Sequence, residues 1–192
     1  MMNIIFVNGP PRSGKDTVGK YLIDEGWNPD KFAYPIRAML RGFGVTGVEF
    51  DRIKDDSEEE FMGMSWRQVA ISFSEDWAKR KFGDGIFGQL CANRCITDYN
   101  DINARTFVLT DCGFREELFV CDGALRTWCR LEGIKYESML LRVHRPGYSY
   151  LNDSRSRVDA LSGMIEAEIT NDHTIEVLYS RLDTIIRAAF EE

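Results

Sequence analysis

Apolar residues along the chain gather in short continuous runs that alternate with segments of helical periodicity. The short runs predict strands, because their length suits a strand that is buried on both faces. They lie at 3–8, 31–34, 106–111, 138–144 and 166–170. Helices are predicted between and after them, at 14–25, 36–43, 115–132 and 174–190. This order predicts an α/β domain in which helices cover both faces of a mostly parallel, five-stranded sheet.

One segment, 44–100, is too long for a plain loop between two strands. Ser65 is a helix-capping residue type, and the apolar side chains of Trp66 and Val69 after it share one helical face. A further helix is expected before the segment ends. We interpret 44–100 as a helical excursion from a single domain that spans 1–192, the usual place to hold a second substrate.

The first predicted strand leads directly into a phosphate-binding loop. Gly9, Gly14 and Lys15 reproduce the G-x-x-x-x-G-K spacing, in which backbone N–H groups and a helix N-terminus face a phosphate. Asp16 stands where Ser or Thr normally meets magnesium, and Thr17 supplies a hydroxyl one position later. The expected phosphate-binding residues are therefore Gly9, Arg12, Ser13, Gly14, Lys15, Asp16 and Thr17.

Loops at the carboxyl ends of parallel strands meet in one crevice, so further candidates follow the other strands. Arg37 comes just after the second predicted strand. Asp111 ends an apolar strand in the Walker-B position, where a carboxylate holds magnesium directly or through water. It could instead cap the next helix or orient Arg115. A guanidinium at Arg115 suits a phosphate because it binds two oxygens at once.

The chain after the fourth predicted strand is rich in arginine. Arg155 and Arg157 lie in a polar segment that we predict to be a lid at about 147–163, and a solvated surface role is an equal alternative. Three further residues are candidates for ligand contacts: Arg145, Arg67 and Asn171. Each has a non-functional alternative. Arg145 and Arg67 could be solvated surface arginines, and Asn171 could be a turn residue rather than part of a purine pocket.

Composition limits the function classes. The net charge of −7 argues against a large nucleic-acid footprint, although it allows a local basic pocket. No apolar run reaches the length of a membrane span, so we expect no membrane partner. Five cysteines without a C-x-x-C pair, and two distant histidines, form no recognisable metal-ligand set. We interpret the cysteines as buried or idle thiols in a reducing, cytoplasmic compartment.

Five of these segments resemble the deoxynucleoside monophosphate kinases of tailed phages, which belong to the adenylate- and thymidylate-kinase-like P-loop kinases. The match runs in order from residue 3 to about 188 and is loose through 44–100. An Asp after the P-loop lysine is normal in that family. The segments are Gly9-x-x-Arg12-Ser13-Gly14-Lys15-Asp16-Thr17, Tyr34-Pro35-Ile36-Arg37, Asp111-x-x-x-Arg115, Arg145-Pro146-Gly147 and Thr170-Asn171-Asp172.

The resemblance implies a P-loop kinase-like three-layer sandwich that uses ATP and magnesium. It implies that a nucleoside monophosphate is held by the excursion, with Arg37, Arg67, Asp111 and Arg115 as substrate-binding residues. It places Arg145 and Asn171 with the P-loop at the ATP, and Asp16 and Asp111 at the metal. The catalytic residues that it implies are Lys15, Asp111, Arg115, Arg155 and Arg157.

Two other functions stay open on the sequence. Phages with hypermodified thymine use related P-loop kinases to phosphorylate 5-hydroxymethyluracil in DNA, and the aromatic residues of 44–100 could hold a flipped base. The acidic pI near 5.0 favours a free nucleotide instead. A nucleotide-dependent switch without an acceptor is the third hypothesis, which the arginine-rich loops disfavour. A monomer and a homodimer are both open, and a phage-encoded protein would act in the host cytoplasm.

Overall fold

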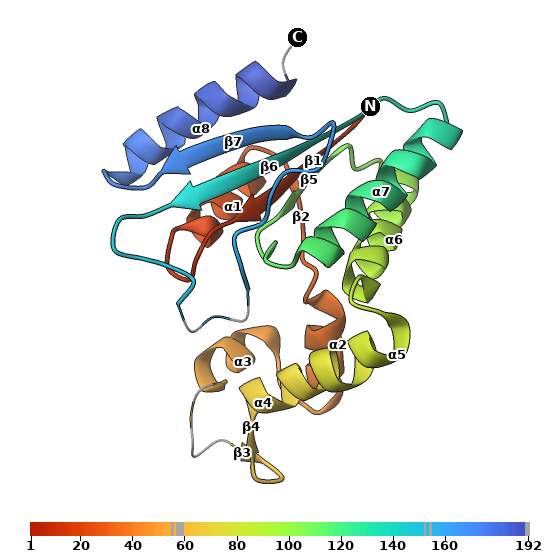
Figure 1. Cartoon of the computed structure of the whole chain (residues 1–192), viewed down its shortest axis with the longest axis vertical. Helices are drawn as coiled ribbons and strands as arrows, with labels where there is room; N and C mark the ends of the chain where they lie inside the picture. Colours follow the sequence, from red (N-terminus) through yellow and green to blue (C-terminus); the bar gives the residue numbers. More distant parts are fainter. Residues whose placement is uncertain (55, 57–59, 152, 154, 191–192) are drawn as a thin grey trace.

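A parallel sheet of five strands forms the centre of the protein in the computed structural model (Figure 1), which describes residues 1–54, 56, 60–151, 153 and 155–190. The spatial order of the strands is β2-β5-β1-β6-β7, and every neighbouring pair is parallel. This confirms the predicted parallel, five-stranded α/β fold. The strands are β1 (Met2–Asn8), β2 (Asn28–Asp30), β5 (Thr106–Leu109), β6 (Tyr136–His144) and β7 (Ile165–Thr170).

Helices cover both faces of this sheet, because successive residues of the central strand β1 point to opposite sides. Ile4 and Phe6 belong to the apolar cluster that includes α6 (Ile86–Asp101) and α7 (Arg115–Leu131). Ile5 and Val7 belong to a second cluster with α1 (Lys15–Asp24) and α8 (Ile175–Phe190). The result is a three-layer sandwich, with α6 and α7 on one side of the sheet and α1 and α8 on the other (Figure 1).

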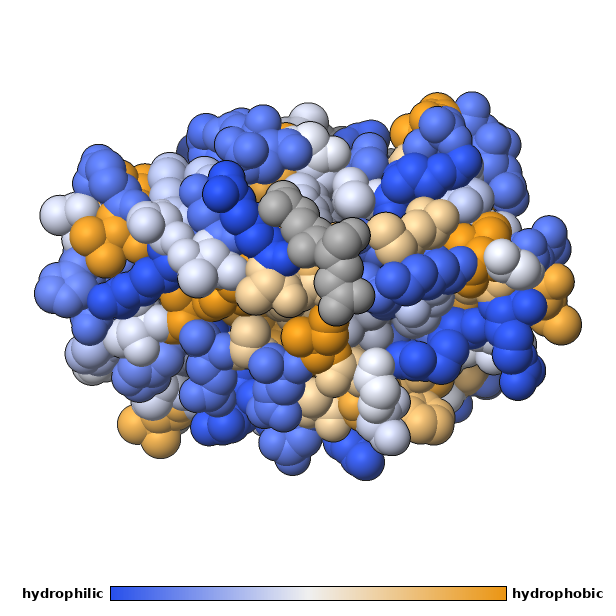
Figure 2. Space-filling view, turned by 90° about the horizontal axis from the view of Figure 1, so that it is seen from above, coloured by the Kyte–Doolittle hydropathy of each residue, from blue (hydrophilic) through white to orange (hydrophobic). Residues whose placement is uncertain are grey.

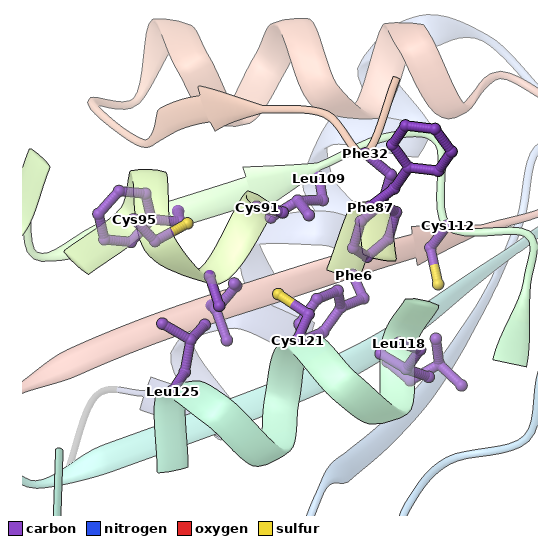
Figure 3. Packing of buried hydrophobic residues seen from close by; sticks show 14 of the residues in the cluster. Phe6, Phe32, Phe87, Cys91, Cys95, Leu109, Cys112, Leu118, Cys121 and Leu125 are labelled. Carbon is purple, nitrogen blue, oxygen red and sulfur yellow. The ribbon is translucent and has the colours of Figure 1, made fainter. Parts of the chain in front are cut away.

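All five cysteines are free and buried in the structure. Figure 3 shows Cys91, Cys95 and Cys121 among the apolar side chains where α6 and α7 face the sheet, close to Phe6 and Leu125. Burial raises the pKa of the Cys91 thiol well above its usual value, so the group stays protonated. The prediction that these thiols are buried is confirmed.

A separate lobe of short helices lies beyond one end of the sheet (Figure 1). It has its own apolar cluster, which includes Leu40, Ile53 and Trp66. Its elements are α2 (Tyr34–Gly42), α3 (Gly47–Ile53), the hairpin β3 (Glu60–Phe61) and β4 (Met64–Ser65), α4 (Trp66–Ile71), the π-helix η1 (Ser72–Lys79) and α5 (Arg80–Phe82).

The bounds of this lobe differ from the predicted excursion at 44–100. The lobe already begins with α2, which the sequence placed beside the sheet. Helix α6 lies inside 44–100 but packs against α7 and the sheet, because its buried side chains, Phe87 and Cys91 among them, join the main core. The helical excursion is therefore α2 to α5, and α6 is part of the sandwich.

The lobe is joined to the sandwich by a buried ion pair. The Nζ atom of Lys79, at the end of η1, lies 3.2 Å from a carboxylate oxygen of Glu117 on α7. The same ammonium lies 3.7 Å from the centre of the Phe114 ring. Burial raises the pKa of Glu117 to about 7, so this contact holds a titratable group at the junction.

The second strand was predicted at 31–34 and lies at 28–30 instead. Phe32, whose apolar side chain suggested a strand, lies in a turn. Its ring stacks on Phe6 at a centroid distance of 6.3 Å. The strand position is fixed by Asn28, whose side-chain Nδ2 donates a hydrogen bond to the Thr106 carbonyl at 3.0 Å. A three-residue edge strand has too little apolar pattern to be located from sequence.

Seen from above, the surface is mostly hydrophilic, with hydrophobic residues in separate small groups (Figure 2). Across the described part of the chain, no helix combines the length and the apolar character that a bilayer crossing requires.

Candidate functional site

The P-loop connects the end of β1 to the start of α1, as the sequence predicted, and two glycines are needed there for space. A Cβ atom on Gly9 would lie 2.6 Å from the Val143 carbonyl oxygen. Gly14 has a φ of +104°, and a Cβ there would lie 2.4 Å from Nδ2 of Asn171. Both positions therefore exclude any side chain, which leaves the loop backbone free to face a phosphate.

Lys15 is almost buried at the first position of α1. Its Nζ donates a hydrogen bond to the Pro10 carbonyl oxygen at 2.7 Å, so the ammonium lies across the loop that it follows. Burial, with a smaller contribution from Arg155, lowers the pKa of Lys15 to about 8. A cation that is poorly solvated and close to another cation gains most from a bound anion. The electrostatics of Lys15 are therefore those of a phosphate site.

A cleft of about 680 Å³ opens from the P-loop toward the lobe. Seven of its lining residues are Lys or Arg and four are Asp, so the cleft is cationic in a chain whose net charge is −7. This local excess of positive charge attracts anions. The charged lining residues are Arg12, Lys15, Asp16, Lys20, Asp30, Lys31, Arg37, Asp51, Lys54, Asp111 and Arg155.

Arg37 lies at the far side of the cleft from the P-loop, on α2. Its two terminal nitrogens donate to the two carboxylate oxygens of Asp51, each at 3.1 Å. Lys54 also contacts Asp51, at 3.3 Å. The carboxylate holds both cations at the cleft wall. Partial burial alone would raise the pKa of Asp51, but the hydrogen bonds and charges of Arg37 and Lys54 outweigh it and lower this pKa. Arg37 thus contributes a second cationic group to the cleft, and its predicted contact with an acceptor stays a prediction.

Asp111 lines the cleft, but its two carboxylate oxygens also accept backbone hydrogen bonds. The donors are the N–H groups of Phe32 at 3.1 Å and Ala33 at 3.0 Å. These bonds hold the turn that leads into α2. The alternative that Asp111 caps the helix after it is wrong, because α7 has no side-chain cap hydrogen bond. Burial is the largest influence on this carboxyl group and raises its pKa. Asp111 therefore connects the sheet to the start of the excursion.

Arg155, from the segment predicted as a lid, lines the cleft. Its guanidinium binds the Asp153 carboxylate through Nε at 2.9 Å and through Nη2 at 2.7 Å. Its side chain lies against Gly113, where a Cβ would meet the Arg155 Cγ at 2.5 Å. Two residues of the predicted lid at 147–163, positions 152 and 154, lie outside the described residues.

Arg157, by contrast, is paired outside the cleft. Its Nη2 lies 2.8 Å from a carboxylate oxygen of Glu168 on the edge strand β7. Arg145 and Asn171 brace the P-loop from outside: Arg145 donates to the Arg12 carbonyl at 3.3 Å, and Asn171 donates to the Ser13 carbonyl at 2.9 Å.

Arg67 and Arg115 are exposed and do not belong to the lining of the cleft. Arg67 is at the start of α4 in the lobe, and Arg115 is at the start of α7. Their predicted contacts with an acceptor stay predictions for a ligand-bound form in which the lobe has moved.

Asn8 is a residue of this site that the sequence analysis missed. It is buried at the end of β1, and its Nδ2 donates to the Cys112 carbonyl at 2.8 Å and the Ser156 carbonyl at 3.0 Å. Its Oδ1 accepts from the Tyr150 hydroxyl at 2.8 Å and from the Val158 N–H at 3.4 Å. The side chain therefore joins the P-loop strand to the segment that carries Arg155.

The residues beside the P-loop also suit magnesium, which prefers oxygen ligands. Asp16 and Asp111 both line the cleft next to Lys15, and Asp16 is exposed to it. In addition, the Ser13 hydroxyl oxygen is buried and has no hydrogen-bond partner among the described residues. Two carboxylates and an unpaired hydroxyl fit a site for a phosphate with its metal ion.

A parallel sheet whose first strand runs through a P-loop into a helix, with helices on both faces, defines the P-loop kinase-like class of α/β proteins. No model of a known protein family matches the chain, and no curated protein sequence matches it. Among solved structures, a candidate kinase from Chloroflexus aurantiacus j-10-fl superimposes with a TM-score of 0.53. The two sequences are 13% identical, over 98% of this chain and 97% of that one.

A sugar kinase from Janibacter sp. HTCC2649 gives a TM-score of 0.48 at 12% identity, over 96% of this chain and 93% of that one. The likeness to the Chloroflexus protein shows a shared fold along almost the full length of both chains. The protein therefore has a kinase fold.

Proposed function

We propose that this protein is an ATP- and magnesium-dependent phosphotransferase that converts deoxynucleoside monophosphates to diphosphates. One observation carries the proposal: the P-loop and the cationic side chain of Arg37 line the same cleft of about 680 Å³. A P-loop alone would serve any nucleotide-binding protein. A second cationic group across the same cleft provides a place for a second anion, which is the requirement of a kinase for phosphorylated acceptors.

The donor would bind with its phosphates against the P-loop backbone. Lys15 would exchange the Pro10 carbonyl oxygen for phosphate oxygens, which offer a negative charge rather than a dipole. Arg155 lies near Lys15 and would neutralise further charge on the transferred group. Magnesium, held by Asp16 and Asp111, would supply further neutralisation when bound.

The acceptor would bind with its phosphate toward Arg37 and Lys54. An oxygen of the acceptor phosphate forms the new bond to the γ-phosphorus, and the bond from that phosphorus to the β–γ bridging oxygen breaks, which leaves ADP. Such a transfer needs alignment and charge neutralisation more than covalent help from the protein. The cations at both ends of the cleft supply these two requirements.

The test is a panel of acceptors, with ADP formation as the readout. We expect at least one deoxynucleoside monophosphate to raise ADP formation well above the rate with ATP alone. A nucleotide-dependent switch would give the same slow rate with every acceptor. Phosphorylation of 5-hydroxymethyluracil-containing DNA, with no activity on any monophosphate, would replace the proposed acceptor by a base in DNA.

Salt dependence separates the two acceptor classes further. A DNA substrate releases a counterion for each neutralised phosphate, so its activity falls steeply as salt rises. A small dianion in an enclosed cleft shows a much weaker dependence. We expect the weak dependence, because the cationic residues gather in the cleft while the whole chain carries a net charge of −7.

A further inference from the structure

The outward side of α7 is unusual for a solvent-facing helix. In Figure 1 this helix lies on the outside of the molecule, and its inward side packs on α6 and the sheet. Residues three and four positions apart share a helix face, so the outward side presents a continuous line of residues. Phe119 is 62% exposed and Leu131 is 75% exposed on it. The line is Glu116, Phe119, Val120, Gly123, Thr127, Arg130 and Leu131.

Gly123 stands in the middle of this line. A Cβ atom built on it meets no other atom within 4 Å, so no packing inside the chain requires a glycine. Glycine destabilises a helix interior relative to alanine, and in the monomer no contact compensates for this loss of stability at Gly123. A glycine at a helix surface lets a second backbone approach closely.

A shallow groove lies beside Gly123 on the same surface. Its volume is about 460 Å³, and Gln89, Ala124, Thr127 and Trp128 contribute to its lining. The exposed ring of Phe119 stands at one end of the groove. The surface thus carries both a protruding aromatic side chain and an apolar hollow, which are the two halves of a self-complementary contact.

The charges on α7 select one arrangement of two such helices. If two copies of α7 cross antiparallel with Gly123 at the two-fold axis, Phe119 lies opposite Thr127 of the partner subunit, in the groove. The same axis sets Glu116 opposite Arg130 of the partner subunit, and the pair occurs twice. Both side chains are exposed, and no ion pair of either is found within the described residues. A parallel pair would instead place like charges together, which is unfavourable.

We propose that this protein forms a homodimer through antiparallel contact of the two α7 helices, centred on Gly123. Burial of Phe119 and Leu131 drives the association, since exposed ion pairs contribute little, and Glu116 and Arg130 set its direction. A helix of 17 residues is about 25 Å long. Its single face is smaller than a standard interface of about 800 Å² per partner, so the dimer should dissociate on dilution.

Sedimentation velocity of the full chain, from about 1 μM to about 500 μM, tests the proposal over the range expected for a small interface. We expect the wild type to change from monomer to dimer within this range. Phe119→Ser should stay monomeric throughout. Phe82→Ser is the matched control, because Phe82 on α5 is also 62% exposed but lies outside α7, and it should dimerise like the wild type.

Charge reversal tests the antiparallel direction. Glu116→Arg and Arg130→Glu, each alone, should weaken dimerisation at least tenfold, and the double variant should restore it because the pairs re-form in reverse. Gly123→Cys should form a disulfide between subunits under mild oxidation, since cysteines at the axis come within disulfide range. Phe82→Cys should not.

Three results would overturn the proposal. One is a wild type that stays monomeric at the highest concentration. The second is a dimer that Phe119→Ser and both single charge reversals leave unchanged, which would place the interface elsewhere. The third is a dimer that the double charge reversal fails to restore, which would contradict the antiparallel pairing.

Discussion

Lys15 shows how one residue of the site follows from local sequence while its chemistry depends on the fold. The spacing from Gly9 to Lys15 is enough to predict the loop, because this pattern is typical of a backbone that turns its N–H groups toward a phosphate. The lowered pKa of Lys15 depends instead on burial and on Arg155, which is 140 positions away in the chain. Sequence pattern could predict the first property and not the second.

The pH dependence of ATP binding follows from that pKa. ATP binds the charged form of Lys15, and the pKa of this lysine in the free protein is about 8. Affinity should therefore be nearly constant below about pH 7 and should fall up to tenfold per pH unit above about pH 8. Isothermal titration calorimetry across this range measures it. Lys15→Arg stays charged throughout and should show a flat profile, whereas a flat profile for the wild type would contradict the expectation.

Arg37→Ala tests the acceptor side of the cleft. Loss of a charge-assisted contact, with Lys54 left as the cation beside Asp51, should weaken monophosphate binding by about one to two decades, or about 1.5–3 kcal/mol. ATP affinity should change little. Arg41→Ala is the control, because Arg41 is on the same helix but outside the lining of the cleft. Equal losses for ATP and the monophosphate, or an equal effect of Arg41→Ala, would remove Arg37 from the acceptor site.

At the scale of elements, the prediction succeeded where a long apolar pattern met a local stop signal and failed where tertiary contacts decided. Strand β1 and helices α7 and α8 were located closely. The second strand was misplaced because the apolar residue Phe32 lies in a turn, where it packs on Phe6, and not in a strand. The boundary of the excursion was also wrong, since the sequence of α6 does not say which apolar partner it packs against.

The close packing of α1 against the end of β5 requires a glycine at position 19, which can be tested. A Cβ at this position would lie 2.2 Å from Cγ2 of Thr110, with its next contact at 3.5 Å. Gly19→Ala should therefore lower the free energy of unfolding by about 1–3 kcal/mol despite its better helix propensity. Thr110→Ser removes the clashing methyl group, so the double variant should recover most of the loss in urea unfolding. A stabilising effect of Gly19→Ala alone would contradict this packing.

The whole molecule combines a sandwich, a lobe and the segment that carries Arg155, and a few residues join these parts across the cleft. Asp111 holds the turn before α2, Lys79 and Glu117 attach η1 to α7, and Asn8 holds the segment that carries Arg155. None of these links has a sequence signature, because each joins positions that are far apart in the chain. They could be recognised only from the structure.

Asn8→Ala tests the link between the P-loop strand and the segment that carries Arg155. Its removal leaves the buried carbonyl group of Cys112 and the partly buried one of Ser156 without this donor, so the free energy of unfolding should fall by about 2–4 kcal/mol. The chain around 148–157 should also become more sensitive to protease. Asn93→Ala is the control, since Asn93 is exposed and bonded only to Gln89 among the described contacts, and it should stay within about 0.5 kcal/mol. Unchanged protease sensitivity in Asn8→Ala would show that other contacts hold the segment that carries Arg155.

The central claim is that Lys15 and the cleft in front of it transfer a phosphoryl group. The rate of ADP formation by Lys15→Ala, with the best monophosphate acceptor and saturating ATP and magnesium, tests it most directly. Circular dichroism and the urea midpoint, measured on the same samples, confirm that the variant is folded. The account predicts a loss of about 100-fold or more, as for removal of a group that neutralises transition-state charge. Turnover within a few-fold of the wild type, by a folded variant, would contradict it.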